Sequence, residues 1–296
     1  MTRRVQRSVR PTISIVGAGN LGSALGLALA AGGYEISSIA VRAKSRRVSS
    51  LARKLKASLV TLGKQALHSD AVWIAVPDDV IAGVARTLAR LQPWRGELVF
   101  HSSGALTSDE LDPLRARGAK VAAVHPMMTF VRDVVPQMAG VSFALEGDPA
   151  AVRAARRIVQ DLGGRPFVIR KENKVLYHVF GSFASPLVIA LMATLEDVAQ
   201  AAGIRKADIK PVMAPLLWQT LRNYLEHDAA AAFSGPLVRG DVATIRRHLQ
   251  ELQKLPHARE VYLALARAAV KKLPARNRSE LKQTFDEQAH ALDARK

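Results

Sequence analysis

The 296-residue sequence contains no cysteine, which excludes disulfide bonds, thiolate nucleophiles and cysteine-ligated metals. It also lacks an uninterrupted apolar run near the roughly 20 residues that a membrane-spanning helix needs. No group of His, Asp and Glu has the spacing typical of a metal site, and there is no Gly-x-Ser-x-Gly nucleophile elbow. We therefore expect a metal-independent protein that does not enter a membrane. The absence of cysteine fits a reducing, cytoplasmic location.

Negative charge is scarce: 25 Asp and Glu residues face 43 Lys and Arg residues, for a formal net charge of +18. Such a surplus has two interpretations, a basic solvated surface that attracts anionic metabolites or a nucleic-acid interface. We favour the first, because the cations are scattered through helical segments and form no basic arm interleaved with aromatic residues. Residues 1–11, "MTRRVQRSVRP", lack the apolar core of a signal peptide, so we expect a basic tail.

The first half of the chain alternates short apolar runs with helical stretches, which is typical of βαβ units around a mainly parallel sheet. The expected strands are residues 12–16, 36–41, 71–76, 97–100, 120–124, 141–145 and 167–169. The helices expected between them are residues 21–31, 46–55, 80–91, 108–117 and 149–162. The pattern predicts a doubly wound α/β domain over residues 12–170.

Beyond about residue 170 the strand-like runs stop and long segments rich in alanine and leucine follow. The expected helices are residues 172–202, 207–228, 242–253, 258–272 and a short segment ending near 293. The first of these is long and contains Pro186, where a kink is expected. Residues 171–296 are therefore predicted to form an all-helical domain.

The stretch "VGAGNLG", residues 16–22, follows the first expected strand and opens a helix. In this context G-x-G-x-x-G predicts a dinucleotide-binding turn. Gly17 permits the turn, Gly19 allows a pyrophosphate to approach, and Gly22 allows close helix packing. Free N–H groups of Asn20 and Leu21 would face the phosphates at the positive end of the helix. The alternative is a purely structural turn.

The end of the second strand distinguishes the two nicotinamide dinucleotides. An acidic residue there would bind the ribose 2′-hydroxyl of NAD, but "VRAKSRR", residues 41–47, contains none. Arg42, Ser45 and Arg46 or Arg47 are instead suited to a 2′-phosphate, which predicts NADP(H). Further along, Val76 and Pro77 are expected beside the cofactor, whereas Asp78 is expected to cap the following helix.

Four further segments carry a family resemblance: "HSSGAL" at 101–106, "AVHPMMTF" at 123–130, "LYHVFGSFAS" at 176–185 and "GPLVRGDVATIRRHL" at 235–249. With the glycine loop, they make residues 12–270 resemble Rossmann-like oxidoreductases whose C-terminal helical half is a domain of unknown function. These belong to the superfamily of 6-phosphogluconate dehydrogenase, pyrroline-5-carboxylate reductase and ketopantoate reductase. The resemblance implies an NADP-dependent oxidoreductase that dimerises through its helical halves. Pro186 departs from the family, in which asparagine is common at this position.

Hydride transfer to a C=O or C=N group needs a proton donor, and a cation for any substrate carboxylate. The catalytic candidates are Ser103, His125, Lys174 and His178. Candidates for substrate contact are Ser103, Tyr177, Ser182, Ser185 and Arg239, and Ser102 is assigned to the cofactor. Positions 174, 178, 182 and 185 form a polar stripe on one face of an otherwise apolar helix. Each candidate also has a structural alternative: a capped turn for the serines, a buried hydrogen bond for the histidines and an interface contact for Arg239.

We therefore expect an NADPH-dependent reductase of a small carboxylated carbonyl compound, for which the resemblance suggests a ketopantoate-like 2-oxo acid. A cyclic imine resembling pyrroline-5-carboxylate is the alternative substrate. Because Pro186 places no polar side chain at a position where the family commonly has asparagine, a non-catalytic NADP(H)-binding sensor or interaction protein is the rival class. We expect a homodimer that binds a small anionic substrate and no specific nucleic acid.

Overall fold

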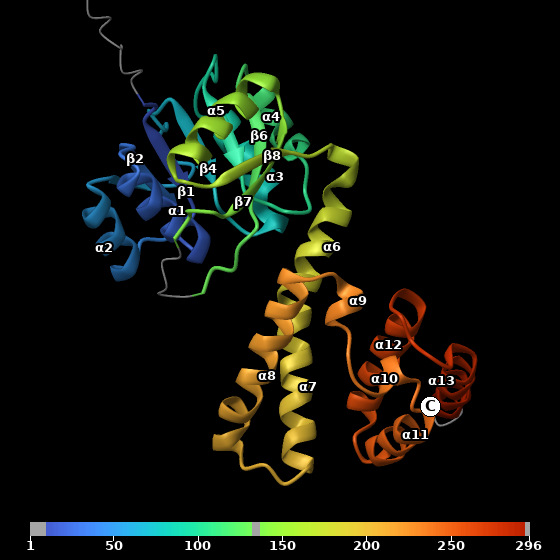
Figure 1. Ribbon diagram of the computed structural model, residues 1–296. Helices are drawn as coiled ribbons and strands as arrows, with labels where there is room; N and C mark the ends of the chain where they lie inside the picture. Colours follow the sequence, from blue (N-terminus) through green and yellow to red (C-terminus); the bar gives the residue numbers. More distant parts are fainter. Residues whose placement is uncertain (1–9, 132–136, 294–296) are drawn as a thin grey trace, which may run out of the picture. The chain divides into compact units, whose positions relative to one another are not determined.

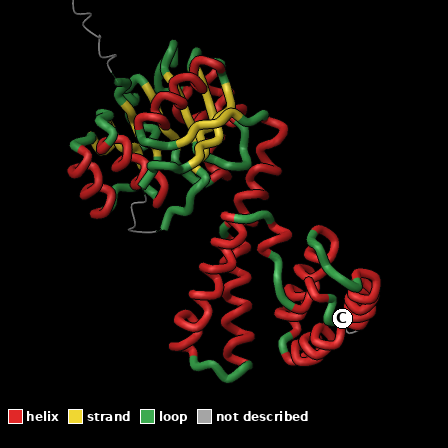
Figure 2. The backbone as a smooth tube through the Cα atoms, viewed as in Figure 1, coloured by secondary structure: helices red, strands yellow, loops and turns green. Residues whose placement is uncertain are grey.

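The computed structural model describes residues 10–131 and 137–293 (Figure 1), so nearly all of the expected basic tail lies outside the described residues. The chain divides into two compact units, of which the first ends at Phe183 and the second begins at Ala184. The first unit holds a sheet with helices packed on it, and the second is helical (Figure 2).

The sheet of the first unit has eight strands in the order β3-β2-β1-β4-β5-β6-β7-β8. All neighbours are parallel except β6 and β7, which are antiparallel. The strands are β1 (Ile13–Val16), β2 (Ile36–Val41), β3 (Ser58–Thr61), β4 (Ala71–Ile74), β5 (Leu98–His101), β6 (Lys120–Pro126), β7 (Ser142–Gly147) and β8 (Arg165–Val168). The predicted doubly wound, mainly parallel fold is confirmed.

Strand β3 was missed by the sequence prediction. It has four residues, "SLVT", and only Val60 among them is buried, because β3 is an edge strand. An edge strand buries less apolar surface than a central one, so its periodic signal is weak. The central strand β1 is instead "ISIV", buried at every position.

Helices cover both faces of the sheet, since alternate residues of a strand point to opposite faces. On β1, Ile13 and Ile15 join one apolar cluster with α1, α2 and α5, whereas Val16 joins a second cluster with α3 and α4. These helices are α1 (Asn20–Ala31), α2 (Arg46–Leu55), α3 (Asp78–Ala89), α4 (Asp112–Arg115) and α5 (Pro149–Asp161). A short 3-10 helix, η1 (Ser108–Leu111), precedes α4.

The remainder of the described chain is helical, after another 3-10 turn, η2 (Lys171–Asn173). The helices are α6 (Lys174–Ala184), α7 (Pro186–Ala201), α8 (Lys206–Glu226), α9 (Ala229–Ala232), α10 (Pro236–Arg239), α11 (Val242–Glu251), α12 (Pro256–Lys272) and α13 (Arg278–Asp293). Buried side chains of α11, α12 and α13, such as Ile245, Leu263 and Phe285, form a third core. The final helix, α13, has 16 residues and is longer than the short segment predicted.

The segment Lys171–Ala201 corrects two predictions. By length and composition alone it could cross a membrane, although the sequence was expected to contain no such stretch. It is also not one kinked helix: Ser185 has φ −134° and ψ −82°, outside the helical region, and separates α6 from α7. The two helices on either side of Ser185 have 11 and 16 residues.

Candidate functional site

The glycine loop after β1 is shaped by very close backbone packing. A Cβ added to Gly17, whose φ is +100°, would lie 2.3 Å from the Ala75 carbonyl oxygen, and one added to Gly22 would lie 2.2 Å from that of Gly17. An added Cβ at Gly19 would meet no atom within 4 Å, so the loop is open there. Gly19 is also the N-cap of α1 and provides no side-chain cap. The first N–H groups of α1 therefore remain available to an anion.

A cavity of about 730 Å³ lies beside this loop. Its lining includes five residues assigned to the cofactor from sequence: Gly17, Gly19, Arg42, Val76 and Pro77. Helix α3 adds Asp79, Arg86 and Thr87, which the sequence prediction missed because helical periodicity does not show which polar positions face a cavity. The cavity combines an uncapped helix start with two guanidinium groups, a donor set that fits a phosphorylated nucleotide.

The other residues assigned to the cofactor take different positions. Asn20 donates a hydrogen bond from Nδ2 to the Phe130 carbonyl oxygen at 3.1 Å, and Leu21 lies in the first turn of α1. Ser45 is the N-cap of α2, where its Oγ accepts a hydrogen bond from the Val48 N–H at 3.3 Å. Ser45 and Arg46 are not among the described residues that line the large cavity.

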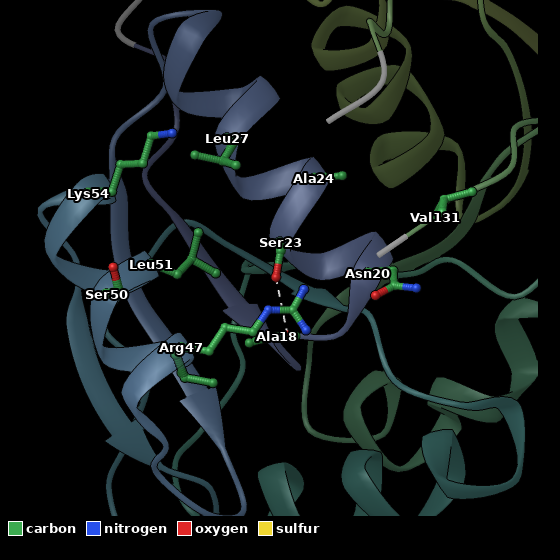
Figure 3. Close-up of a pocket in the computed structure, with 11 residues that line it drawn as sticks. Ala18, Asn20, Ser23, Ala24, Leu27, Arg47, Ser50, Leu51, Lys54 and Val131 are labelled. Atoms are coloured by element: carbon green, nitrogen blue, oxygen red, sulfur yellow. Dashed lines mark hydrogen bonds between the residues drawn. The ribbon is translucent and has the colours of Figure 1, made fainter. Parts of the chain in front are cut away.

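A second hollow of about 370 Å³ lies between α1 and α2 (Figure 3). Asn20, Ser23 and Leu27 of α1 line one side of it, and Arg47 and Lys54 of α2 line the other. Its lining includes Ala18 and Val48, which also line the large cavity. Arg47 extends towards the glycine loop near Ala18 (Figure 3), whereas Arg46 lines neither of these two cavities.

Lys174, the first residue of α6, is the central group of the predicted catalytic set. Its side chain is 1% exposed, and its Nζ donates a hydrogen bond to the Ser103 carbonyl oxygen at 3.0 Å. Burial lowers the pKa of Lys174 to about 8, although the nearby carboxylates of Glu146 and Asp78 oppose this shift. Lys174 is thus a cation at neutral pH that gives up its proton more easily than an exposed lysine.

The two serines after β5 are both engaged in hydrogen bonds. Ser102 Oγ accepts a hydrogen bond from the Trp73 indole N–H at 2.8 Å. Ser103 Oγ accepts one from the Leu106 N–H at 2.9 Å and donates one to Asp78 Oδ2 at 2.7 Å. Asp78 therefore does not cap α3 as expected: Pro77 occupies the N-cap position, and the Asp78 carboxylate bonds to Ser103.

His125, Tyr177 and His178 form an aromatic cluster around Gly104. His125 Nδ1 lies 2.8 Å from the Tyr177 hydroxyl oxygen, and the centroid of its ring is 6.2 Å from that of His178. A Cβ added to Gly104 would lie 2.6 Å from His178 Cδ2 and 2.9 Å from His125 Nε2. Burial lowers the pKa of His125 to about 4 and raises that of Tyr177 to about 12. Both groups are therefore uncharged at neutral pH.

Two buried residues of this region were not found from the sequence. His101 Nδ1 accepts a hydrogen bond from the Ser103 N–H at 3.1 Å, so its Nε2 donates to the Thr107 carbonyl oxygen at 3.0 Å. Burial lowers the pKa of His101 to about 3. Glu146, in β7, accepts hydrogen bonds from the N–H and the hydroxyl of Ser108 at 2.6 and 2.9 Å. The only sequence signal was that His101 directly precedes the serine pair.

The remaining substrate-contact candidates are Ser182, Ser185 and Arg239. Ser182 lies on α6, but its Oγ donates a hydrogen bond to the His178 carbonyl oxygen at 3.0 Å, within the helix. Ser185 and Arg239 belong to the second unit, at the N-cap of α7 and the end of α10. Of the expected polar stripe, Lys174 is bonded to Ser103 and His178 lies beside Gly104, both in the turn after β5.

Two family models match separate parts of the chain. Residues 2–126 match the model of a Rossmann-like domain, and residues 141–269 match that of a domain of unknown function, DUF2520. The chain thus joins a Rossmann-like domain to a DUF2520 domain, as the resemblance predicted. A search of the curated proteins gives no match.

Solved structures share the fold along most of the chain. Protein BF3122 from Bacteroides fragilis is 21% identical, with 87% of this chain and 97% of that chain covered and a TM-score of 0.73. An imine reductase from Myxococcus stipitatus in complex with NADP+ is 20% identical (88% and 94% covered, TM-score 0.60). A pyrroline-5-carboxylate reductase from Coxiella burnetii is 19% identical (92% and 98% covered, TM-score 0.56). At these identities the likeness establishes a common fold.

Proposed function

We propose that the protein is an NADP-dependent oxidoreductase that reduces a small carbonyl or imine compound with NADPH. The observation that carries the proposal is the grouping of polar residues at one edge of the sheet. The glycine loop, Pro77, Ser103 and His125 follow or end the neighbouring parallel strands β1, β4, β5 and β6. Ligands of open α/β sheets bind at this carboxyl edge.

The cofactor assignment is supported by the fit of the donors to a phosphorylated dinucleotide. Uncapped N–H groups at the start of α1 suit the pyrophosphate, and Arg42 suits a 2′-phosphate. NADPH would supply the hydride. The NADP+ complex of the imine reductase from Myxococcus stipitatus, which has the same fold, further supports this assignment.

Protonation of the reduced group is assigned to residues of this chain. Lys174, with a pKa of about 8, can stabilise a developing negative charge and deliver a proton. The Tyr177 phenol is the second donor that we propose, oriented by the His125 ring. His178, beside Gly104, keeps its proposed role as proton donor, and Ser103 holds Lys174 in place.

Two substrate classes follow from this chemistry. A 2-oxo acid resembling ketopantoate would place its carboxylate near Lys174. A cyclic imine resembling pyrroline-5-carboxylate is favoured by the names of two neighbours with the same fold, a pyrroline-5-carboxylate reductase and an imine reductase. Absorbance at 340 nm with NADPH and a panel of both substrate classes tests the proposal. Tight NADPH binding without any turnover would favour the non-catalytic sensor and contradict the reductase.

We further propose a cytoplasmic homodimer. Large apolar side chains are strongly exposed on the neighbouring helices α7 and α8, for example Ile189 and Trp218 at 67% and 68%. Exposed apolar side chains in such number are typical of a protein interface. The basic surface is assigned to attraction of the anionic substrate and not to specific nucleic-acid binding, so duplex DNA should dissociate at physiological salt.

A further inference from the structure

Asp78 lies between the large cavity and the catalytic candidates Ser103 and Lys174. It is the first residue of α3, and its sequence neighbours Pro77 and Asp79 both line the large cavity. Its own carboxylate instead accepts the 2.7 Å hydrogen bond from Ser103 Oγ. A carboxylate in the first turn of a helix is also favoured by the helix dipole. Asp78 therefore links the start of α3 to the turn after β5.

Ser103 is held at each of its polar atoms. Its N–H donates to His101 Nδ1, its Oγ accepts from the Leu106 N–H, and its carbonyl oxygen accepts from Lys174 Nζ. A hydroxyl has one hydrogen, and that of Ser103 is used by Asp78. The Asp78 carboxylate thus accepts the last free hydrogen of Ser103, whose carbonyl oxygen binds the Lys174 ammonium group.

We propose that Asp78 is a positioning residue, which acts through Ser103 to orient the Lys174 ammonium group and to keep it charged. The importance of Asp78 for turnover rests on the proposed reductase function. Its effect on Lys174 does not, because that effect depends only on bonds within the first unit.

The charged and titratable groups around Lys174 come from several elements. They are Asp78 on α3, His101 on β5, His125 on β6, Glu146 on β7 and His178 on α6 itself. His101 and His125 are neutral near pH 7 because burial lowers their pKa values. Glu146 raises the pKa of Lys174 more than Asp78 does, but its carboxylate is bonded to Ser108 and not to Ser103. Asp78 therefore has two effects: its charge raises the pKa of Lys174 against the effect of burial, and it is bonded to Ser103, whose carbonyl oxygen accepts the Lys174 hydrogen bond.

Asp78→Asn tests the proposal, because it keeps the side-chain shape but removes the charge. The pKa of Lys174 is read by NMR from the pH dependence of its side-chain 13Cε chemical shift, because this readout needs no reagent to reach the buried amine. We expect this pKa to fall by about half a unit, and kcat/KM with NADPH to fall about fivefold with its basic limb shifted to lower pH. Asp78→Glu, which retains the charge, should recover most of both effects. Because Asp78 is exposed, neither variant should unfold the protein.

Glu172→Gln is the matched control, since it removes an exposed carboxylate two residues from Lys174 that pairs with Arg170. It should leave the Lys174 titration profile unchanged. If Asp78→Asn and Glu172→Gln give the same Lys174 profile as the unmodified protein, the proposal is overturned. A shifted profile in a protein that reduces no substrate would contradict the reductase function and leave the positioning role standing.

Discussion

The Nδ1 atom of His125 and the hydroxyl oxygen of Tyr177 lie 2.8 Å apart, although 52 positions separate the residues in the chain. The bond joins the end of β6 to the first turns of α6. Because the pKa of His125 is lowered to about 4 and that of Tyr177 is raised to about 12, a neutral ring meets a neutral phenol at pH 7. One hydrogen is shared between them, so each orients the other.

Tyr177→Phe should lower kcat/KM for NADPH-dependent reduction by about tenfold or more, because it removes an oriented donor. The dissociation constant of NADPH should stay within about twofold. The chain offers a matched control in Tyr262, whose hydroxyl lies 3.1 Å from His248 Nδ1 in the helical unit. Steady-state kinetics of Tyr177→Phe and Tyr262→Phe should differ; equal rates in both would contradict the role of Tyr177.

Arg42→Ala should weaken NADPH binding about tenfold and leave NADH binding nearly unchanged, because only NADPH carries the 2′-phosphate. Fluorescence titration with both cofactors measures the ratio. Arg53→Ala, an exposed cation in the last turn of α2, controls for the general positive charge. A larger loss for Arg46→Ala than for Arg42→Ala would move the phosphate site away from the large cavity.

His101 should make the first unit sensitive to acid. Its folded pKa of about 3 is below the value of 6.5 of an unperturbed histidine, so between these values the unfolded chain binds a proton that the native chain does not. The contribution of His101 to the free energy of unfolding is therefore fully present above pH 6.5. It falls as the pH decreases towards 3, by up to about 1.4 kcal/mol per pH unit. Urea unfolding at pH 7 and 5 should show a smaller acid loss for His101→Gln. His227→Gln, at an exposed histidine, should keep the original slope.

Gly104→Ala should reduce kcat/KM by about tenfold or more, because the new methyl group would push away the His125 and His178 rings. Overpacking of this kind costs about 1 to 3 kcal/mol in the free energy of unfolding. Gly181→Ala, on α6, would meet only the flexible Met127 side chain, at 3.2 Å, and serves as the control. Kinetics and urea titration of both variants test the prediction, and an unaffected Gly104→Ala enzyme would place the reaction elsewhere.

Trp218→Glu should convert the proposed dimer into monomers, since it places a charge within the exposed apolar surface of α8. Multi-angle light scattering after size-exclusion chromatography measures the mass. Gln219→Glu adds the same charge at the next, already polar position of the helix. The dimer proposal fails if the unmodified protein is a monomer at micromolar concentration.

Much of the fold could be predicted because its signals are local. Buried strands such as "ISIV" of β1 and the glycine loop at Gly17 can be predicted from a few neighbouring residues, since periodicity and backbone sterics act over that range. The same local rules located Lys174 and His178 on one helix face. They failed at β3, where an edge position leaves little apolar pattern, and at Ser185, where one non-helical residue ends α6.

The roles within the site were decided by tertiary structure. The sequence predicts Asp78 as a helix cap, but the pairing of β4 with β5 brings its carboxylate to the Ser103 hydroxyl, 25 positions away. Lys174 gains its low pKa from burial against a carbonyl group 71 positions earlier, and no local pattern encodes that distance. The sequence by itself therefore determined the Rossmann-like fold and the residue types of the candidate site. Only the packing of β5, β6 and α6 decided which atoms meet, because desolvation and hydrogen bonding depend on neighbours that are remote in the chain.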